Sequence, residues 1–269
     1  MNPVAPQKTV ENTDLGTIPN PLYRVELVKE GRKRFYQATA HDGSWQHNYP
    51  GVTGTLAIIG GEKTQKLIGW AKKESLASVK RELLRMGPNP VLLEPDTIDG
   101  IISRASKKPK DILEAAADYG TRLHDHCDRV IKGLPVSPED DLEHSVLAFQ
   151  DWFKASGLKI VLGDTAVASI THSYGGKFDA VAVKDGCYVI IDFKTSSGIR
   201  EEAALQAAAY GKAFEETYGL PAPLGLIVRF DKTTPTFETK WVKNMDDSFN
   251  GFLAAKNLQQ IVTGELFRA

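Results

Sequence analysis

The stretch YGGKFDAVAVKDGCYVIIDFKT, Tyr174–Thr195, decides the fold of this chain. It contains two runs rich in valine, isoleucine, alanine and aromatic residues, and Asp185-Gly186 separates them. An Asp-Gly pair between two such runs is one of the strongest short-range signals for a β-hairpin. The sequence therefore predicts a two-residue turn in which Lys184 faces Cys187.

Two carboxylates become neighbours in this predicted hairpin. Counting five residues outward from the turn along each strand places Asp179 directly opposite Asp192. Facing like charges destabilise a strand pair, and a buried unpaired carboxylate costs several kcal/mol, so we expect a positive group between them. A divalent cation is the simplest candidate. The alternative is a structural ion-pair cluster in which Lys194 and Lys177, which the same register places opposite each other, neutralise the acids.

Alternation along the two strands assigns each side chain to a face of the sheet. Asp192 and Lys194 share one face, and Phe193 points to the other. The first face otherwise holds Tyr188, Ile190, Val181 and Val183, and the second holds Phe178, Ala180, Ala182, Val189 and Ile191. Both sets are apolar, which predicts a central strand covered on both faces.

The segment after the hairpin, GIREEAALQAAAYGKAFEETYG at 198–219, has the composition of a helix. Gln206 and Tyr210 stand four residues apart in it, so both side chains lie on one helix face. Further helices are expected at 64–86, 96–106, 111–132, 137–156 and 246–262. Strands are expected at 22–28, 34–39, 159–162, 165–171, 224–230 and 237–243.

Glycine, proline and charge runs mark the expected breaks between these elements. Gly87–Pro90 ends the first long helix, the KKPK run at Lys107–Lys110 is interpreted as a basic turn, and residues 41–51 as a loop. Residues 52–64 resemble a phosphate-binding loop only superficially, because Glu62 interrupts the Gly-Lys-Thr that such a loop requires.

The chain divides into three parts by composition and hydrophobic pattern. Residues 1–20 predict a flexible arm, residues 21–157 a hairpin and a helical lobe, and residues 158–269 a core of sheet and helices that forms one compact unit with 21–157. Helices followed by a charged sheet indicate an α/β fold, with a helical lobe across the active edge of the sheet.

Composition excludes several classes of protein. The chain has 269 residues, 42% of them hydrophobic, and a formal net charge of −1, which argues against disorder and against a uniformly cationic nucleic-acid-binding protein. Residues 61–110 carry eleven Lys and Arg against six Asp and Glu, as a phosphate-tracking surface or a solvated helix face would. No apolar run of membrane-spanning length and no signal peptide is present, which predicts a cytoplasmic protein without a membrane partner.

Two cysteines, Cys127 and Cys187, are too few for a disulfide framework, and their separation fits no zinc module. An iron–sulfur cluster requires four ligands, so none is expected. Both thiols are interpreted as buried, apolar-like side chains.

Five short motifs follow one another along the chain: Y-P-x-V-T at 49–53, G-T-x-x-H at 120–124, G-x-x-D at 176–179, D-x-K at 192–194 and Q-x-x-x-Y at 206–210. In this order they resemble the PD-(D/E)XK nuclease superfamily, in its RecB-like and phage-type exonuclease branch, which includes the mitochondrial genome maintenance exonuclease. The resemblance implies a central mixed β-sheet flanked by helices. It also implies a bacterial or phage-infected cell as the setting.

The resemblance assigns roles to the hairpin residues. Asp179 and Asp192 would bind one or two Mg²⁺ or Mn²⁺ ions, with the backbone carbonyl of Phe193 as a further ligand. Lys194 would orient or deprotonate the attacking water or stabilise the transition state. Gln206 and Tyr210 would hold the hydrogen-bond network of the catalytic site or touch the nucleic-acid backbone.

The resemblance also implies that His124 completes a metal shell, with Asp125 and His126 as rival candidates. An imidazole ligand suits Mn²⁺ better than Mg²⁺. Aligning backward without gaps from Asp179 puts Asp164 where relatives carry a glutamate, as a water-mediated ligand or a polarising charge. The expected nucleic-acid contacts are Thr195, Ser196, Lys72, Lys73 and Thr121.

These features predict a metal-dependent DNA exonuclease acting on single strands or duplex ends. An endonuclease of the same fold is the nearest alternative. A non-cleaving protein that binds DNA ends with a recombination or single-strand-binding partner is another. A phosphohydrolase built on His124-Asp125 would be all helical, whereas half of this chain predicts sheet.

Overall fold

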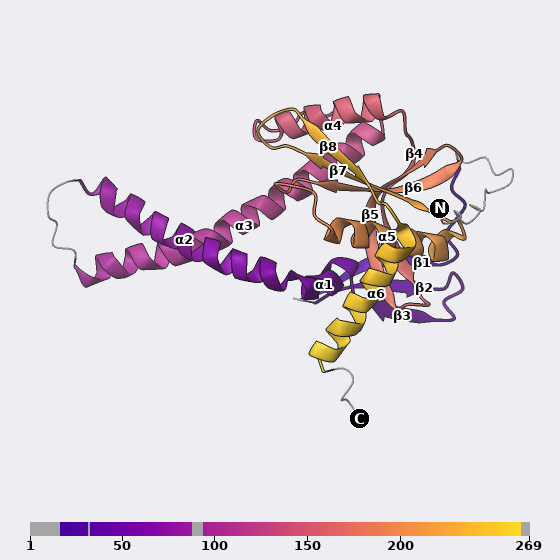
Figure 1. Cartoon of the computed structure of the whole chain (residues 1–269), viewed down its shortest axis with the longest axis horizontal. Helices are drawn as coiled ribbons and strands as arrows, with labels where there is room; N and C mark the ends of the chain where they lie inside the picture. The colour runs from indigo at the N-terminus through magenta and orange to yellow at the C-terminus, as the bar shows by residue number, and fades with distance from the viewer. Residues whose placement is uncertain (1–16, 32, 88–93, 265–269) are drawn as a thin grey trace, which may run out of the picture. The chain divides into compact units, whose positions relative to one another are not determined.

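The computed structural model describes residues 17–31, 33–87 and 94–264 (Figure 1). The chain forms two compact units. We call Met1–Ile58 with Leu123–Ala269 the sheet unit, and Ile59–Arg122 the helical unit. Most of the predicted flexible arm, and the predicted helix stop from residue 88 onward, lie outside the described residues.

The sheet unit contains a five-stranded sheet with the strand order β4-β5-β6-β7-β8. Strands β6 and β7 are parallel, and the other neighbours are antiparallel. The strands are β4 (Lys159–Ser169), β5 (Tyr174–Lys184), β6 (Cys187–Lys194), β7 (Leu224–Phe230) and β8 (Phe237–Trp241). With the helices beside it, this sheet makes the sheet unit a mixed α/β structure, as expected.

The β5–β6 hairpin has the predicted register. Lys184 pairs with Cys187, and the pairing continues outward to Ala180 and Ile191. Both turn residues have positive φ angles, 48° at Asp185 and 79° at Gly186, as the favoured two-residue hairpin turn requires. The Asp-Gly pair therefore sets which residues of the two strands meet.

Helices α4 and α5 cover opposite faces of this hairpin (Figure 1). Helix α5 (Glu202–Tyr218) supplies Phe214, which contacts Tyr188, and helix α6 (Met245–Val262) packs beside α5. Helix α4 (Glu143–Ser156) supplies Phe149 and Trp152, whose rings contact Phe193. The central strand is therefore covered on both faces, as predicted.

The predicted face of Phe178 is wrong. Its ring contacts Phe214 of α5, and it belongs to the same apolar cluster as Val181 and Ile190. Residues 178 and 181 differ by an odd number of positions, so strict alternation cannot place both on one face. The alternation is broken between them, beside Asp179.

A second, three-stranded sheet contains β1 (Arg24–Glu30), β2 (Lys33–Thr39) and β3 (Gln46–Tyr49). The expected hairpin is present, but the loop expected at 41–51 contains β3, because its residues pair with the outer half of β2. The predicted boundary at residue 157 also differs from the two compact units. The N-terminal hairpin and α4 belong to the sheet unit, where Tyr23 Oη donates to the Ala168 carbonyl over 2.7 Å.

The helical unit contains α2 (Gly61–Arg85) and most of α3 (Pro95–Ile131). The basic turn predicted at Lys107–Lys110 is wrong, because α3 runs through it with Pro109 inside the helix. A proline in a helix costs one main-chain hydrogen bond, and the long helical segments on both sides maintain the helix across it. Before α2 come α1 (Val52–Leu56) and a short 3₁₀ turn (Ala57–Gly60), and the boundary between the two units falls within this turn.

Two further boundaries differ from expectation. The two strands predicted at 159–171 are one strand with an irregular register between Ile160 and Leu162, and α4 begins at Glu143 rather than near residue 137. Over residues 17–31, 33–87 and 94–264, no helix has both the length and the apolar character needed to cross a bilayer.

Candidate active site

Asp179 and Asp192 lie at the end of the hairpin ladder that points away from the turn. Main-chain pairing stops at Ala180 and Ile191, and the two aspartates are the next residue on each strand. The main-chain N–H of Phe193 donates over 2.6 Å to Asp179 Oδ2, so a carboxylate replaces a main-chain acceptor. This hydrogen bond holds Asp179 against β6 at the point where the ladder ends.

His124, from the part of α3 that belongs to the sheet unit, meets the same carboxylate. Its Nδ1 lies 2.8 Å from Asp179 Oδ1. Burial opposes the charged imidazolium, but the neighbouring carboxylate outweighs it, and the pKa of His124 is raised. Of the rival candidates, His126 Nε2 faces Glu139 Oε2 at 3.3 Å and Asp125 is exposed.

A chain of polar contacts runs from Asp192 to α5. Lys194 Nζ lies 2.6 Å from Asp192 Oδ2 and donates over 3.0 Å to Gln206 Oε1. Gln206 Nε2 in turn donates over 2.7 Å to Tyr210 Oη. The spacing of four residues on α5 therefore brings both predicted polar side chains to the hairpin, where they orient the lysine.

The two acids differ in their electrostatic surroundings. Burial raises the pKa of Asp192 to about 6, and the Asp179 charge adds to this although Lys194 opposes it. Burial also disfavours ionisation of Asp179, but His124, Lys194 and the Phe193 N–H together outweigh it and lower its pKa. One carboxylate is thus firmly charged, and its neighbour is held as an anion at an energetic cost.

The donor atoms suit Mg²⁺ or Mn²⁺, which prefer carboxylate oxygens and, for Mn²⁺, accept imidazole. Within the described ranges, no group of three His, Cys, Asp or Glu side chains is arranged as it stands to hold a metal ion. His124 is turned onto Asp179, and Lys194 covers Asp192. Asp192 Oδ2 is nevertheless buried without a hydrogen bond of good geometry, despite its contact with Lys194. Such an oxygen fits a cation ligand.

Gly176 leaves room for Tyr210. A Cβ atom built at Gly176 would overlap the Tyr210 ring at Cε1. The neighbouring Gly175 N–H donates over 2.9 Å to the Pro50 carbonyl. The Y-P-x-V-T and G-x-x-D motifs therefore meet where β5 begins. Because Gly176 has no side chain, the Tyr210 ring can lie against its backbone.

The structure does not bring Asp164 to the other acids. Its Oδ1 lies 2.6 Å from Lys177 Nζ, and its side chain is exposed. The described residues show no hydrogen bond or ion pair between Asp164 and His124 or Asp192. Lys177 therefore neutralises Asp164 rather than Asp179, unlike the ion-pair cluster considered as the alternative to a cation.

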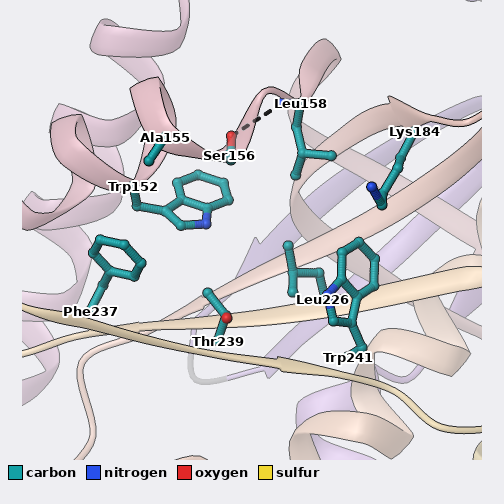
Figure 2. Close-up of a pocket in the computed structure, with 9 residues that line it drawn as sticks. All are labelled: Trp152, Ala155, Ser156, Leu158, Lys184, Leu226, Phe237, Thr239 and Trp241. Atoms are coloured by element: carbon teal, nitrogen blue, oxygen red, sulfur yellow. Dashed lines mark hydrogen bonds between the residues drawn. The ribbon is translucent and has the colours of Figure 1, made fainter.

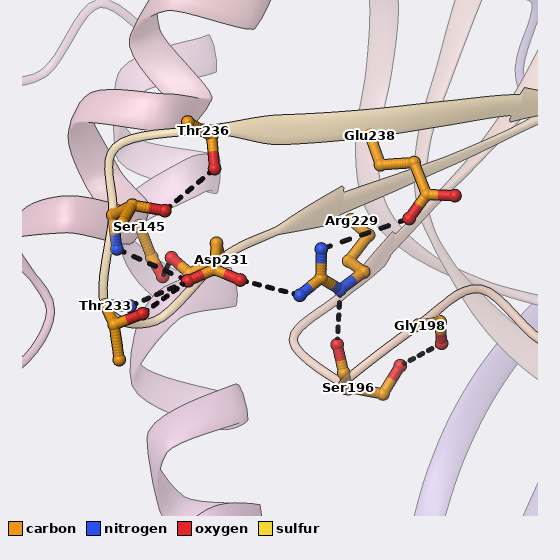
Figure 3. A network of polar contacts seen from close by, with 9 residues as sticks. Ser145, Ser196, Gly198, Arg229, Asp231, Thr233, Thr236 and Glu238 are labelled. Atoms are coloured by element: carbon orange, nitrogen blue, oxygen red, sulfur yellow. Dashed lines mark hydrogen bonds and ion pairs between the residues drawn. The ribbon is translucent and has the colours of Figure 1, made fainter.

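The loop after β6 is held by a network around Arg229 (Figure 3). Arg229 pairs with Lys194 in the parallel ladder, and its Nε donates over 2.6 Å to the Ser196 carbonyl. Asp231 Oδ2 accepts from the same guanidinium over 2.7 Å. Ser196 Oγ donates to the Gly198 carbonyl over 2.9 Å, and Thr195 is half-buried. The two predicted phosphate contacts thus lie in an anchored loop beside Lys194.

The other predicted nucleic-acid contacts belong to the helical unit. Lys72 and Lys73 are exposed on α2. Thr121 is exposed on α3, one turn before His124, and its Oγ1 donates to the Ala117 carbonyl over 3.2 Å.

Sequence reasoning missed two charged residues on the elements that build the site. Asp128 lies one turn after His124 on α3, and its Oδ1 is buried without a hydrogen bond while its Oδ2 meets Lys132 Nζ at 2.6 Å. The spacing of four residues from His124 was the available signal. Arg229 was the other, and only the parallel pairing of β6 with β7 places it beside Lys194.

A separate hollow on the α4 side of the sheet contains none of these groups. This pocket of about 220 Å³ has Trp152 from α4 and Trp241 from β8 among its walls (Figure 2). Lys184, next to the hairpin turn, is its one charged lining residue among those described. The candidate active site therefore lies at the opposite end of the hairpin from this apolar pocket.

Comparison with other proteins gives no relative: no family model matches this chain, and none of the curated proteins matches its sequence. The geometry of the site therefore has to support any functional conclusion by itself.

Proposed function

We propose that this protein is a metal-dependent DNA exonuclease of the PD-(D/E)XK kind, hydrolysing phosphodiester bonds from single-stranded or duplex ends. The observation that carries the proposal is the position of Asp179 and Asp192, side by side where the hairpin ladder ends, with Lys194 on one of them and His124 on the other. An acid pair in this position is costly for the fold, and binding a divalent cation would offset that cost.

Asp179, Asp192 and His124 would hold the ion after His124 and Lys194 turn from their present partners. A bound Mg²⁺ or Mn²⁺ would make a water nucleophilic at neutral pH and stabilise charge on the phosphate. Lys194 would then place its ammonium at the attacking water or at a phosphate oxygen. Its hydrogen bond to Gln206, itself held by Tyr210, restricts where that ammonium can go.

In the absence of an ion, contacts with neighbouring groups would stabilise the two charged acids. Lys194 screens the buried Asp192 carboxylate, and His124 with the Phe193 N–H screens Asp179. Each acid therefore has a partner that can be displaced without moving the main chain. A protein that only binds DNA ends would gain nothing from keeping this costly pair.

Asp192→Ala tests the proposal directly. Cleavage of a labelled linear single-stranded DNA in Mg²⁺ or Mn²⁺ should fall by about 10³-fold or more, because a ligand of the proposed metal ion is lost, and with it the ion's stabilisation of charge on the phosphate. Asp151→Ala removes an exposed acid from α4 and is the matched control, expected to cleave like the wild type. Chelator should abolish cleavage by both active proteins. Equal cleavage by Asp192→Ala and wild type would refute the proposal.

A circular substrate separates the proposed exonuclease from an endonuclease of the same fold. A strict exonuclease leaves circular single-stranded DNA whole while it degrades the linear form of the same sequence. Degradation of both forms at similar rates would identify an endonuclease instead.

A further inference from the structure

A pocket of about 360 Å³ lies in the sheet unit next to the candidate active site. Its walls come from β7 and β8, from the residues just before α5 and from the start of α6. The charged lining residues are Arg200, Lys240, Lys243, Glu201 and Asp247. Its volume lies in the range of sites that bind small ligands or parts of larger ones.

This pocket lies on the same face of the sheet as Asp192. Ile227, one of its walls, is the parallel partner of Asp192, and Lys240 is the antiparallel partner of Ile227. Partners on neighbouring strands place their side chains on one face. Two inter-strand spacings separate Asp192 from Lys240, which is about 10 Å.

Two of the three cations in the pocket have no acidic partner among the described residues. Neither Arg200 nor Lys243 forms an ion pair or a side-chain hydrogen bond with any residue in the described part of the chain. Lys240 has a loose contact, 3.7 Å from its Nζ to Glu238 Oε1. Cations elsewhere in the sheet unit are often tightly paired, as Lys177 is with Asp164 at 2.6 Å.

The two acids of the pocket form no ion pair with these cations in the described part of the chain. Asp247 is engaged at the start of α6, where its Oδ2 accepts from Asn244 Nδ2 over 2.7 Å. Glu201 is exposed and forms no ion pair with a described residue. The pocket therefore presents available positive charge on the side of the sheet where Asp192 and Lys194 lie.

The loop that connects Lys194 to Arg200 is held in place by a hydrogen bond. Arg200 follows Lys194 by six residues, and the connecting loop is held by the hydrogen bond from Arg229 Nε to the Ser196 carbonyl. A ligand that occupies both the pocket and the candidate active site would thus contact both Lys194 and Arg200, the two ends of this loop.

We propose that this pocket is a phosphate subsite for the DNA strand, in which Arg200, Lys240 and Lys243 hold a phosphate close to the bond that is cleaved. The inference rests on the proposed nuclease function and extends it. A separation of about 10 Å corresponds to about three nucleotides at the 3.4 Å rise of a duplex strand. The subsite would hold the strand in register while Lys194 and the acid pair act.

The test compares two double variants that each lose two lysine charges. Lys240→Gln/Lys243→Gln alters the pocket, and Lys154→Gln/Lys159→Gln removes two exposed lysines on α4 and β4 that do not line it. Each is made in an Asp192→Asn background with chelator, so that no strand is cut. Binding of a fluorescent twelve-nucleotide single-stranded DNA is measured from low to moderate salt.

Each phosphate contact contributes about 0.7 to the slope of log affinity against log salt for a single strand. The pocket variant should therefore lose up to about 0.7 from this slope, because the subsite holds one phosphate, and it should bind more weakly at low salt. The control should match its parent. Equal slopes for the two double variants, or no salt-dependent binding by the parent, would overturn the subsite.

A small diester separates failure of the subsite from failure of the proposed function. Bis(p-nitrophenyl) phosphate has no second phosphate to reach the pocket, so the pocket variant with Asp192 intact should cleave it like the wild type. Cleavage of this diester together with equal binding slopes would leave the nuclease standing without the subsite. A slope difference without any cleavage would leave a strand-binding pocket without a nuclease.

Discussion

The sheet unit and the helical unit treat their large apolar side chains in opposite ways. In the sheet unit, Phe214 and Ile190 are fully buried between the sheet and α5. In the helical unit, Leu76 is 71% exposed and Leu84 is 69% exposed. Two helices alone cannot bury all of the apolar surface that their sequences carry, whereas a sheet covered on both faces can.

This difference explains why a site with a buried charge lies in the sheet unit. Asp192 is only 3% exposed, so the protein holds a charged carboxylate in its interior at a cost. Such a cost is tolerated where a large core offsets it, and the sheet unit supplies that core. A region with few buried contacts opens locally at low free energy and cannot hold side chains to the same precision.

The largest expected effect tests this contrast in burial. Phe214→Ala should lower the free energy of unfolding by about 4 kcal/mol, because it leaves a cavity among fully buried side chains. Leu84→Ala should change it by about 0.5 kcal/mol or less, since most of its side chain already faces water. Urea denaturation followed by tryptophan fluorescence measures both, and similar losses would contradict the contrast.

The pH dependence of stability tests whether Asp192 is a buried, costly charge. Because burial raises the pKa of Asp192 to about 6, the folded protein retains a proton between about pH 4 and pH 6 that the unfolded chain releases. Stability contributed by this group therefore falls as pH rises through that window. Asp192→Asn removes the loss, so in chelator at pH 7.5 the variant should be more stable than the wild type by about 3 kcal/mol.

At pH 4.5 the same comparison should show a much smaller advantage for Asp192→Asn. Urea midpoints at the two pH values provide the measurement. An advantage that stays constant or shrinks toward pH 7.5 would argue against a buried, costly charge.

A single methyl group should matter in the sheet unit. Gly176→Ala places a Cβ against the ring of Tyr210 on α5, and the resulting overpacking should cost about 2 kcal/mol. Displacing Tyr210 should also weaken the hydrogen bond that holds Gln206. Thermal unfolding checks the first effect, and cleavage rates check the second. An unchanged melting temperature would show that this packing is looser than the structure indicates.

The same change should have the opposite sign in the helical unit. Gly69 lies inside α2, and a Cβ built there meets no atom within 4 Å. Gly69→Ala should therefore stabilise the helix by about 1 kcal/mol, since alanine loses less backbone entropy than glycine. Hydrogen exchange of α2 amides provides a local measure. Destabilisation at this position would indicate a close partner for that face.

Local structure could be predicted from the sequence wherever it depends on residues that are neighbours along the chain. The positive φ angles at Asp185 and Gly186 follow from their side chains, and the turn then determines the register as far as Ala180. The helix with Gln206 and Tyr210 follows from composition in the same way. The continuity of α3 through Pro109 was not predictable, because the strength of the flanking helix competes with a local breaking signal.

By itself, the sequence determined the tight turn, and hence that Asp179 and Asp192 end the ladder together. Only the tertiary structure decided what those acids touch: His124 arrives from α3, Lys194 binds Gln206 across to α5, and Arg229 arrives through the parallel strand β7. The physical reason is range. A turn is set by the dihedral preferences of two residues, whereas the surroundings of a buried charge depend on segments that meet only when the core packs.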